Sequence, residues 1–91
     1  MMGVTWDPNK KTANWKKHHV DFDEAATVLV DPLSTTFPDP DHSQREERCV
    51  TIGLSAQSRV LVVAHADAGE RIRIISARRA TRRERGFYEE D

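Results

Sequence analysis

Arginine is the residue type in this chain that points most clearly to chemistry, and it is concentrated near the C-terminus. Residues 71–85 hold seven arginines, no lysine and a single acid, Glu84. A guanidinium group is planar and binds phosphate oxygens through two parallel N–H donors, which an ammonium group cannot do. The run therefore indicates a phosphate or nucleic-acid site, with a solvated helix face as the alternative. Its members are Arg71, Arg73, Arg78, Arg79, Arg82, Arg83 and Arg85.

The formal net charge of the 91 residues, -1, conceals this cluster. Residues 1–17 hold four lysines and one aspartate, a net charge of +3. Residues 18–47 hold eight acids and one arginine, a net charge of -7, whereas residues 48–91 hold nine arginines and six acids, a net charge of +3. The average charge is thus a cancellation between segments, and it does not argue against a polyanionic partner.

Four arginines lie in or beside predicted strands and are candidates for a shared phosphate contact. Arg78 directly follows the last predicted strand, and Arg73 lies inside that strand. Arg48 and Arg59 open the two preceding strands, so antiparallel pairing can bring them near the other two.

Each of these arginines also has a purely structural interpretation. Arg73 fits a solvent-exposed sheet face equally well. For Arg48 and Arg59 the alternative is an ion pair with an acid. The acids considered for that pairing are Glu46, Glu47 and Glu70.

Alternating apolar residues predict the strands that carry these arginines. Strands are expected over 48–55, 59–65 and 71–77, joined by short turns as an antiparallel meander, with Gly53 as a candidate bulge position. Residues 3–6 are a possible edge strand, and 32–44 are expected to form a loop. In the last strand, period two places Ile72, Ile74 and Ser76 on one face and Arg71, Arg73, Ile75 and Ala77 on the other.

Capping signals predict three helices around this sheet. Asp7 before Pro8 starts a helix that runs to about His18. Asp21 starts a second helix, which ends before Pro32. Thr81 with Glu84 starts a short helix that runs toward Glu90. The predicted fold class is α+β: a small antiparallel sheet of three to four strands, two N-terminal helices and a short C-terminal helix.

Composition excludes several classes of protein and of site. The length predicts one domain, residues 1–91, and no apolar run approaches the roughly 20 residues of a membrane span. The start of the chain has no apolar leader, and the single cysteine, Cys49, excludes a disulfide framework and a cysteine-based zinc site, so a reducing, cytoplasmic location is expected. His18, His19 and His42 match no compact metal motif, and neither a metal nor a cofactor is expected.

An ordered set of motifs covers nearly the whole chain. They are Trp6-Asp7, Asn14-x-x-Lys17-His18-x-Val20-x-Phe22-x-Glu24-Ala25, Asp31-Pro32, Asp41-His42-Ser43, Glu47-Arg48, Ile52-Gly53, Arg59-x-Leu61-x-Val63, and Ile72-Arg73-Ile74-Ile75-Ser76-Ala77-Arg78-x-Ala80-Thr81-x-x-Glu84-Arg85-x-x-Tyr88-Glu89. This set resembles the BrnT family, the toxin component of type II toxin–antitoxin pairs.

The resemblance implies a RelE-like fold and a ribonuclease that arrests translation. Metal-free cleavage of RNA uses the neighbouring 2′-hydroxyl as nucleophile and needs cations that stabilise the charge at phosphorus. The candidates for that catalytic role are Arg48, Arg59, Arg73 and Arg78. The resemblance also implies a partner antitoxin, BrnA, which carries a ribbon-helix-helix DNA-binding domain and forms a heterotetramer with the toxin. One departure is visible, because the family generally has glycine where this chain has His19. The end of the first helix is therefore expected to be strained or shifted.

The resemblance also bears on the remaining candidate residues. Lys17 and His18 match a Lys-His pair of the family and are candidates for proton transfer, since histidine titrates near neutral pH. Capping of its own helix is the alternative for His18, and Glu47 is a second candidate base. The other expected RNA contacts, which could equally serve the antitoxin or form a plain helix face, are Arg79, Arg82, Arg83 and Arg85.

Two functions of different classes therefore remain open. The first is a metal-independent endoribonuclease toxin with RNA as substrate. The second is a non-catalytic module that binds nucleic acid or a partner through the same arginines.

Overall fold

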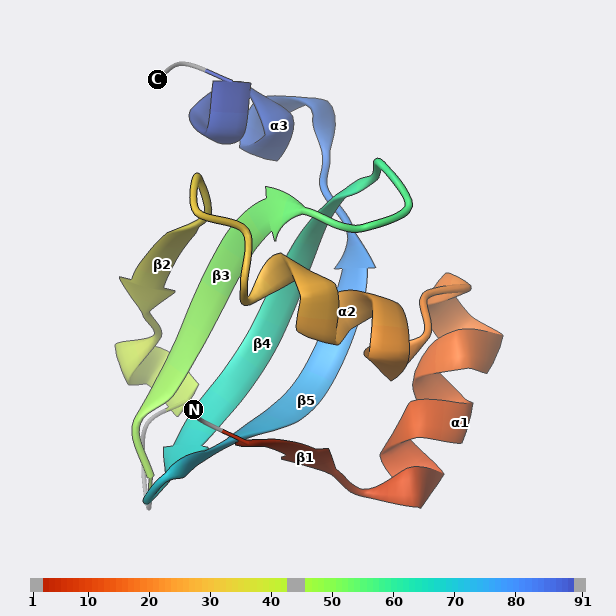
Figure 1. Cartoon of the computed structure of the whole chain (residues 1–91), viewed down its shortest axis with the longest axis vertical. Coiled ribbons are helices and arrows are strands. Elements are labelled where there is room, and N and C mark those ends of the chain that lie inside the picture. Colours follow the sequence, from red (N-terminus) through yellow and green to blue (C-terminus); the bar gives the residue numbers. More distant parts are fainter. Residues whose placement is uncertain (1–2, 43–45, 90–91) are drawn as a thin grey trace.

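A five-stranded mixed sheet forms the centre of the structure, a computed structural model that describes residues 3–42 and 46–89 (Figure 1). The strand order is β1-β5-β4-β3-β2. The strands are β1 (Gly3–Trp6), β2 (Thr35–Pro38), β3 (Arg48–Leu54), β4 (Val60–Ala68) and β5 (Arg71–Arg79). The helices are α1 (Pro8–His18), α2 (Phe22–Val28), α3 (Arg82–Glu89) and the 3-10 turn η1 (Pro40–His42).

The α+β class and the three predicted helices are confirmed, but the prediction of an antiparallel sheet of three to four strands was wrong, because the sheet has five strands and is mixed. β1 runs parallel to β5, because a long excursion through α1, α2 and three further strands separates them and lets the chain return in the same direction. β2 lies within the predicted loop, where four residues ending in Pro38 show no apolar alternation. It is an edge strand, where proline costs no ladder hydrogen bond. Ser43, Gln44 and Glu90, which belonged to the predicted loop and helix, lie outside the described residues.

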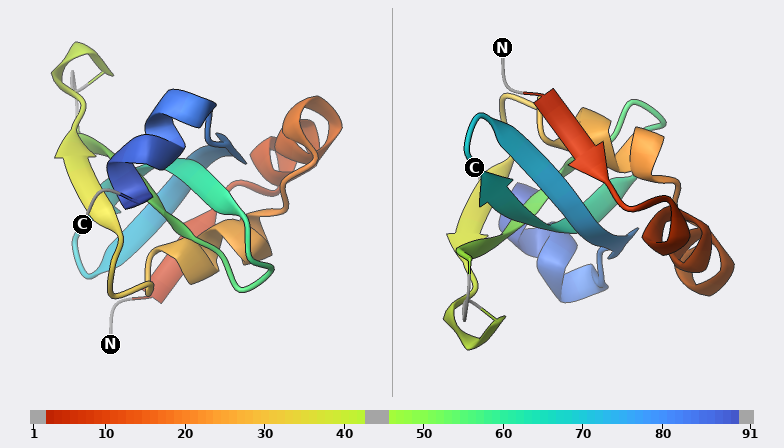
Figure 2. Two further views of the ribbon diagram at one scale, coloured as in Figure 1. Left: turned by 90° about the horizontal axis from the view of Figure 1, so that it is seen from above. Right: turned by 90° about the horizontal axis from the view of Figure 1, so that it is seen from below.

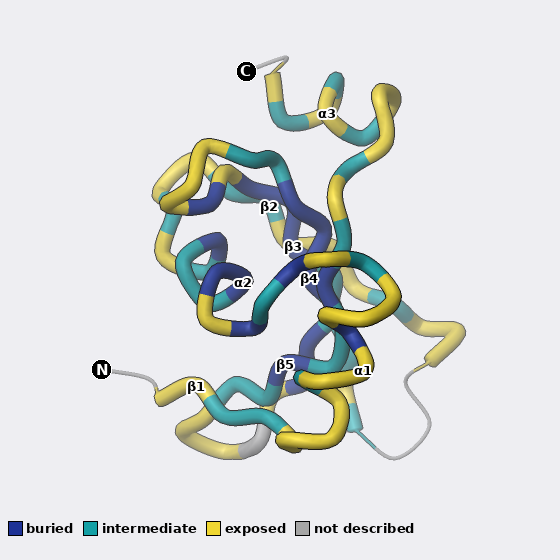
Figure 3. Tube along the Cα trace, turned by 90° about the vertical axis from the view of Figure 1, so that its right-hand side faces the viewer, coloured by how far each residue is buried: buried dark blue, intermediate teal, exposed yellow. Residues whose placement is uncertain are grey.

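The two faces of the sheet are covered differently (Figure 2). α2 packs on one face and α3 lies over the end of the other, while α1 flanks the β5 edge. Burial follows this division, with the buried residues concentrated between α2 and the sheet (Figure 3). The core cluster consists of Val20, Phe22, Ala25, Val28, Leu61, Val63, Ile74 and Ala77. No helix among the described residues is long and apolar enough to cross a membrane.

A β-bulge in β5 changes which side chains share a face. Ala64 of β4 pairs with Ser76, but the next residue of β4 pairs with Ile74, so Ile75 is left without a partner. The side-chain alternation therefore slips by one residue at this point. Ala77 joins Ile74 in the core, and Ser76 lies on the opposite face, which corrects the simple period-two prediction.

Asn14 fixes α1 against β5 directly beyond this bulge. Its side-chain amide donates to the carbonyl oxygens of Ala77, at 2.8 Å, and Val20, at 2.9 Å, and its oxygen accepts from the Ala77 N–H at 3.0 Å. β1 pairs with β5 only as far as Ile74, so the Asn14 amide satisfies the edge of β5 where β1 has ended. Asn14 is buried, and each of these bonds satisfies a polar group that would be costly to leave unpaired.

The end of α1 shows the consequence of His19. The residue adopts the left-handed conformation, with φ 56° and ψ 36°, and its N–H donates to the carbonyl of Trp15. Glycine adopts this conformation at no steric cost, whereas a side chain is disfavoured there. The predicted strain at this position is therefore confirmed.

Gly53 serves close packing rather than a bulge, since β3 and β4 pair without a register shift over all seven β3 residues. A Cβ atom at Gly53 would lie 2.8 Å from Cβ of Ser34 and 3.0 Å from Cγ1 of Val28. We predict that Gly53→Ala lowers the free energy of unfolding by about 1–3 kcal/mol, because the connection after α2 must move away from the sheet. Urea denaturation measures this change.

Gly86→Ala is the matched control for Gly53→Ala. A Cβ atom at Gly86 meets nothing within 4 Å, and alanine is favoured over glycine within a helix. The control should leave the unfolding midpoint unchanged or slightly raised. Equal loss of stability in both variants would contradict the packing role of Gly53.

Candidate nucleic-acid interface

The bulge in β5 gathers three arginines on the sheet face opposite α2, which we call the arginine face. Arg48 and Arg73 pair with the same β4 residue, Ala66, and residues in register across a sheet share a face. Arg78 pairs with Val62, four residues earlier on β4 and on the same face. Without the bulge, positions 73 and 78 would point to opposite faces. The two arginine rows lie about 13 Å apart along the strand.

The lower row, Arg48 and Arg73, is bridged by Glu46. A carboxylate oxygen of Glu46 accepts from Nη2 of Arg73 in a short ion pair, and the same oxygen lies 3.9 Å from Nε of Arg48. All three side chains are about one third exposed. The predicted ion pair of Arg48 with Glu46 is thus present, and a negatively charged group is already held between two guanidinium groups.

The upper row holds a second carboxylate, Glu84, on Arg78. The two guanidinium nitrogens of Arg78 donate to the two oxygens of Glu84 at 2.7 and 2.8 Å. The carboxylate also accepts from the N–H of Thr81, whose hydroxyl in turn accepts from the N–H of Glu84. The predicted capping box is therefore confirmed. These contacts, first of all the one to Arg78, lower the pKa of Glu84 to about 2.

The arginine face can therefore bind two anionic groups at once. Arg78 holds both oxygens of one carboxylate in the paired geometry that a phosphate can use, whereas the lower row shares a single oxygen of Glu46. Arg78 remains 42% exposed and Arg73 37% exposed, so both can be reached from solvent. Replacing a carboxylate by a phosphate keeps each guanidinium group paired, while the displaced carboxylate exchanges its guanidinium partner for water.

Lys17 and His18 lie beside the arginine face. They line a hollow of about 240 Å³ between α1 and the bulge, together with Ile75 and Ser76. Ser76 also lines the hollow beside Arg78, so the two regions meet at this residue. Both basic residues also belong to the last turn of α1, where positive charge interacts favourably with the helix dipole. The structural and the chemical interpretations of this pair are therefore both compatible with its position.

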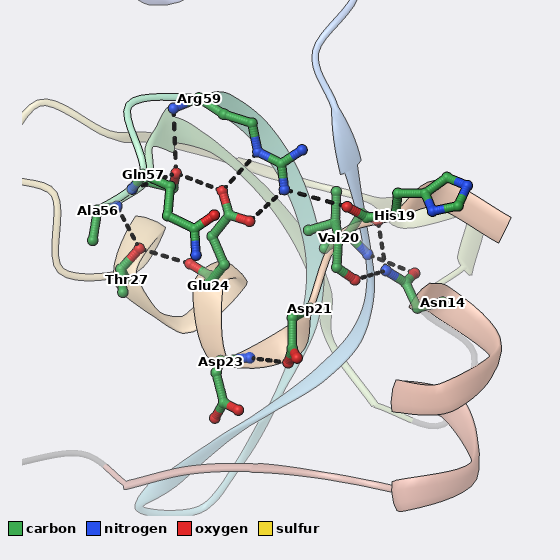
Figure 4. Close-up of polar contacts among 12 residues, drawn as sticks. Asn14, His19, Val20, Asp21, Asp23, Glu24, Thr27, Ala56, Gln57 and Arg59 are labelled. Carbon is green, nitrogen blue, oxygen red and sulfur yellow. Dashed lines mark hydrogen bonds and ion pairs between the residues drawn. The ribbon is translucent and has the colours of Figure 1, made fainter. Parts of the chain in front are cut away.

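Arg59 is used differently, in an ion pair with the core-facing residue Glu24 (Figure 4). Its Nε donates to one carboxylate oxygen at 2.9 Å, and its Nη2 donates to the other and to the carbonyl of His19. The Ser55 hydroxyl also donates to Glu24, at 2.7 Å. The side chain of Glu24 is 2% exposed. The alternative prediction that Arg59 forms an ion pair was thus correct, but its partner is Glu24 and none of the acids that were proposed.

Those contacts decide how Glu24 titrates. The hydrogen bond from Arg59, and then the one from Ser55, outweigh burial and lower the pKa of the Glu24 carboxyl. The same pairing raises the pKa of Arg59. Sequence reasoning missed this pair because 35 residues separate its members.

The four arginines expected to contact RNA lie at the C-terminal end of β5 and on α3, whereas Arg71 lies at the start of β5. Arg79 and Arg85 line a third hollow, of about 290 Å³, with Arg59. Arg82 and Arg83 are exposed on α3, a helix none of whose eight residues is buried. The structure therefore places these arginines around α3 and not within the arginine face itself.

Comparison with known proteins decides the family. The model of a family described as "Ribonuclease toxin, BrnT, of type II toxin-antitoxin system" matches residues 6–84. The chain belongs to the BrnT family. The BrnT match includes the strands that carry the arginine face. It ends at Glu84, the last residue of the capping box.

A solved BrnT structure supports this assignment. The chain is similar to the ribonuclease toxin BrnT of Brucella abortus, solved at 1.1 Å, with 25% sequence identity and a TM-score of 0.71. The similarity covers 90% of this chain and all of the Brucella chain. No curated protein sequence matches the chain. The family is one of ribonuclease toxins, so an RNA target and an antitoxin partner follow from membership at that level.

We predict that Arg59→Ala lowers the free energy of unfolding at neutral pH by about 3 kcal/mol. The change leaves Glu24 buried and charged without its partner, and the partial exposure of Arg59 places the loss at the low end of the range for such pairs. Denaturant unfolding at several pH values measures it. Lys11→Ala, which removes an exposed pair with Asp23, is the control and should change little.

The pH dependence of Arg59→Ala tests the cause of its instability. A carboxyl whose folded pKa is lowered adds stability above its unfolded pKa of about 4.3, and that stability is lost as pH falls through the folded value. In the variant, burial without Arg59 raises the pKa of Glu24 instead, so protonation relieves the penalty. The difference from the parent chain should therefore narrow as pH falls from the raised pKa of Glu24 in the variant, above about 4.3, to its lowered pKa in the parent chain. A pH-independent difference would contradict the charge explanation.

Proposed function

We propose that this BrnT-family chain is a metal-independent endoribonuclease that cleaves RNA through its 2′-hydroxyl and thereby arrests translation. The observation that carries the proposal is the alignment of Arg48, Arg73 and Arg78 on one sheet face, each within reach of an anionic group. Three guanidinium groups supply positive charge without a metal.

The arginines would act on the phosphate in the transition state. Attack by the 2′-hydroxyl gathers negative charge on the phosphorane oxygens, and fixed N–H donors stabilise that charge more than they stabilise the substrate. Arg78 presents two donors in the parallel geometry that such oxygens require, because its bond to Glu84 already fixes that geometry. Displacing Glu84 would release the donors to the substrate.

Proton transfer would come from α1. A base must accept the proton of the 2′-hydroxyl, and an acid must protonate the leaving oxygen. His18, and beside it Lys17, lie next to Ser76 on the border of the arginine face. We therefore keep His18 as the proposed base, with Lys17 as the second proton-transfer candidate, and assign Arg59 to the fold because Glu24 occupies it.

Control of the activity would come from a second protein. A BrnA-type antitoxin with a ribbon-helix-helix domain would neutralise the toxin in a heterotetramer, and the complex would bind operator DNA through the antitoxin. The exposed arginines of α3 are the proposed contacts to RNA or to this partner.

A non-catalytic binding module remains the second candidate. Its support is that carboxylates hold Arg73 and Arg78 in ion pairs, while His18 has no hydrogen bond to either of them among the described residues. Such a module would bind RNA with an affinity that falls steeply with salt, and it would leave the RNA intact.

We predict that Arg78→Ala and Glu84→Gln, which break the same ion pair, have opposite effects on RNA. Arg78→Ala should lower the cleavage rate about 10²–10³-fold, the usual effect of removing one charge-stabilising donor. Glu84→Gln keeps the capping box, because glutamine also accepts from the Thr81 N–H, and it frees the arginine. Its cleavage rate should be unchanged or higher. Cleavage products on a denaturing gel measure both rates.

The shared structural loss makes these two variants controls for each other. Both should lower the melting temperature by similar amounts, because each removes the contact between β5 and α3. Equal loss of cleavage in both would show that Arg78 only holds α3. Full cleavage by a folded Arg78→Ala protein would overturn its assignment to the active site.

We predict that cleavage proceeds at the same rate in the presence of a strong metal chelator. The arginine face supplies the positive charge that a metal ion would otherwise supply. The measurement compares RNA cleavage by the purified chain with and without the chelator. Loss of cleavage that returns with added divalent ions would contradict metal independence, and binding without any cleavage would favour the binding module.

A further inference from the structure

A hollow of about 530 Å³ lies on the arginine face between its two rows. Its floor is apolar, formed by Val50 and Ile52 of β3 and Val62 and Ala64 of β4. Phe37 of β2 and Phe87 of α3 also line it, one from each of the elements that border this face. The hollow therefore combines apolar sides with two aromatic rings.

The two phenylalanines are exposed although an apolar floor lies beside them. Phe87 is 53% exposed and Phe37 is 41% exposed. Phe87 belongs to α3, which buries no residue, so its ring is not needed to fill a core. Exposed rings on a basic face are the usual platforms on which single-stranded nucleic acids stack their bases.

Polar groups lie at two borders of the hollow: Asp39, which is paired with His42, lies beside β2, and Glu84 lies on α3 beside its partner Arg78. Ser76 and Arg78 of β5 also line it, and the Arg73 row continues the same face about 13 Å further along the strand. A purely apolar peptide would cover the floor but leave these guanidinium groups without new partners. A nucleotide presents an aromatic base and a phosphate together, so its two parts match the two parts of this surface.

We propose that the hollow binds one unstacked nucleobase of a single-stranded RNA, held against Phe37 and Phe87, with the adjoining phosphate at Arg78. This inference rests on the proposed function, since it assumes that RNA binds to the arginine face. It adds a base-binding site to the phosphate contacts, and base stacking accounts for recognition of single strands in preference to duplexes.

The test uses a short 2′-O-methyl oligonucleotide that contains 2-aminopurine, whose fluorescence is quenched by stacking. The methyl group removes the nucleophile, so the oligonucleotide binds without cleavage by the proposed reaction. The parent chain should bind it and quench its fluorescence. Phe37→Leu and Phe87→Leu should each weaken binding about tenfold and reduce the quenching, because leucine keeps the apolar surface but removes the ring.

Matched variants separate base binding from phosphate binding. Trp15→Leu removes a ring of similar exposure, 52%, on α1 and should leave affinity and quenching unchanged. The dependence of affinity on salt should be the same in both phenylalanine variants as in the parent chain, whereas Arg78→Ala should lower its slope by about one. Phe37→Leu does not alter α3. A loss of binding in this variant therefore cannot result from release of that helix.

The outcomes distinguish this site from the function on which it rests. Unchanged binding and quenching in both phenylalanine variants, in a parent chain that binds and cleaves RNA, would overturn the base site alone. Failure of the parent chain to bind the oligonucleotide at low salt would overturn the RNA-binding function as well. Intact oligonucleotide binding with lost binding of an antitoxin would identify the hollow as a protein-docking groove and would also overturn the proposal.

Discussion

The one-residue slip at Ile75 is the constraint on which the arginine face depends. In a regular strand, positions 73 and 78 point to opposite faces, and one of the two arginines would enter the core beneath α2. The bulge returns Ala77 to the core and leaves Arg73 and Arg78 together outside it. Asn14 holds the backbone directly after the slip by bonding both the N–H and the carbonyl of Ala77. The same bulge therefore places Ala77 in the core and the two arginines together on the opposite face.

Two carboxylates make such a dense guanidinium cluster compatible with a stable fold. Glu46 and Glu84 each neutralise part of the repulsion on the arginine face, and the pKa of Glu84, lowered to about 2, keeps it ionised at any physiological pH. Any incoming phosphate must compete with these internal anions. This competition favours ligands that carry more negative charge than a carboxylate or that engage both rows at once.

Local signals in the sequence predicted most of the helices and strands, whereas contacts between segments distant in the sequence were not predicted. Asp7, Thr81 and the period-two strands act through neighbours a few residues away, so their helices and strands were placed correctly. The bulge at Ile75 has no such signal, because it depends on how β4 and α1 hold β5. The ion pair of Arg59 with Glu24 joins residues 35 positions apart, and only the folded structure reveals it. Candidate site residues were thus predictable as residue types but not as members of one face.

The attachment of α3 links ligand binding to the position of this helix. None of its residues is buried, and its ends are held by polar contacts: Glu84 binds Arg78, and the hydroxyl of Tyr88 donates to Asp31 at 2.7 Å. A phosphate that takes Arg78 from Glu84 removes the first of these attachments. The free energy of releasing that end of α3 must then be subtracted from the affinity for the phosphate. By reciprocity, any partner that holds α3 in place strengthens the bond between Glu84 and Arg78 and weakens the binding of RNA at this arginine, without having to contact the arginine itself.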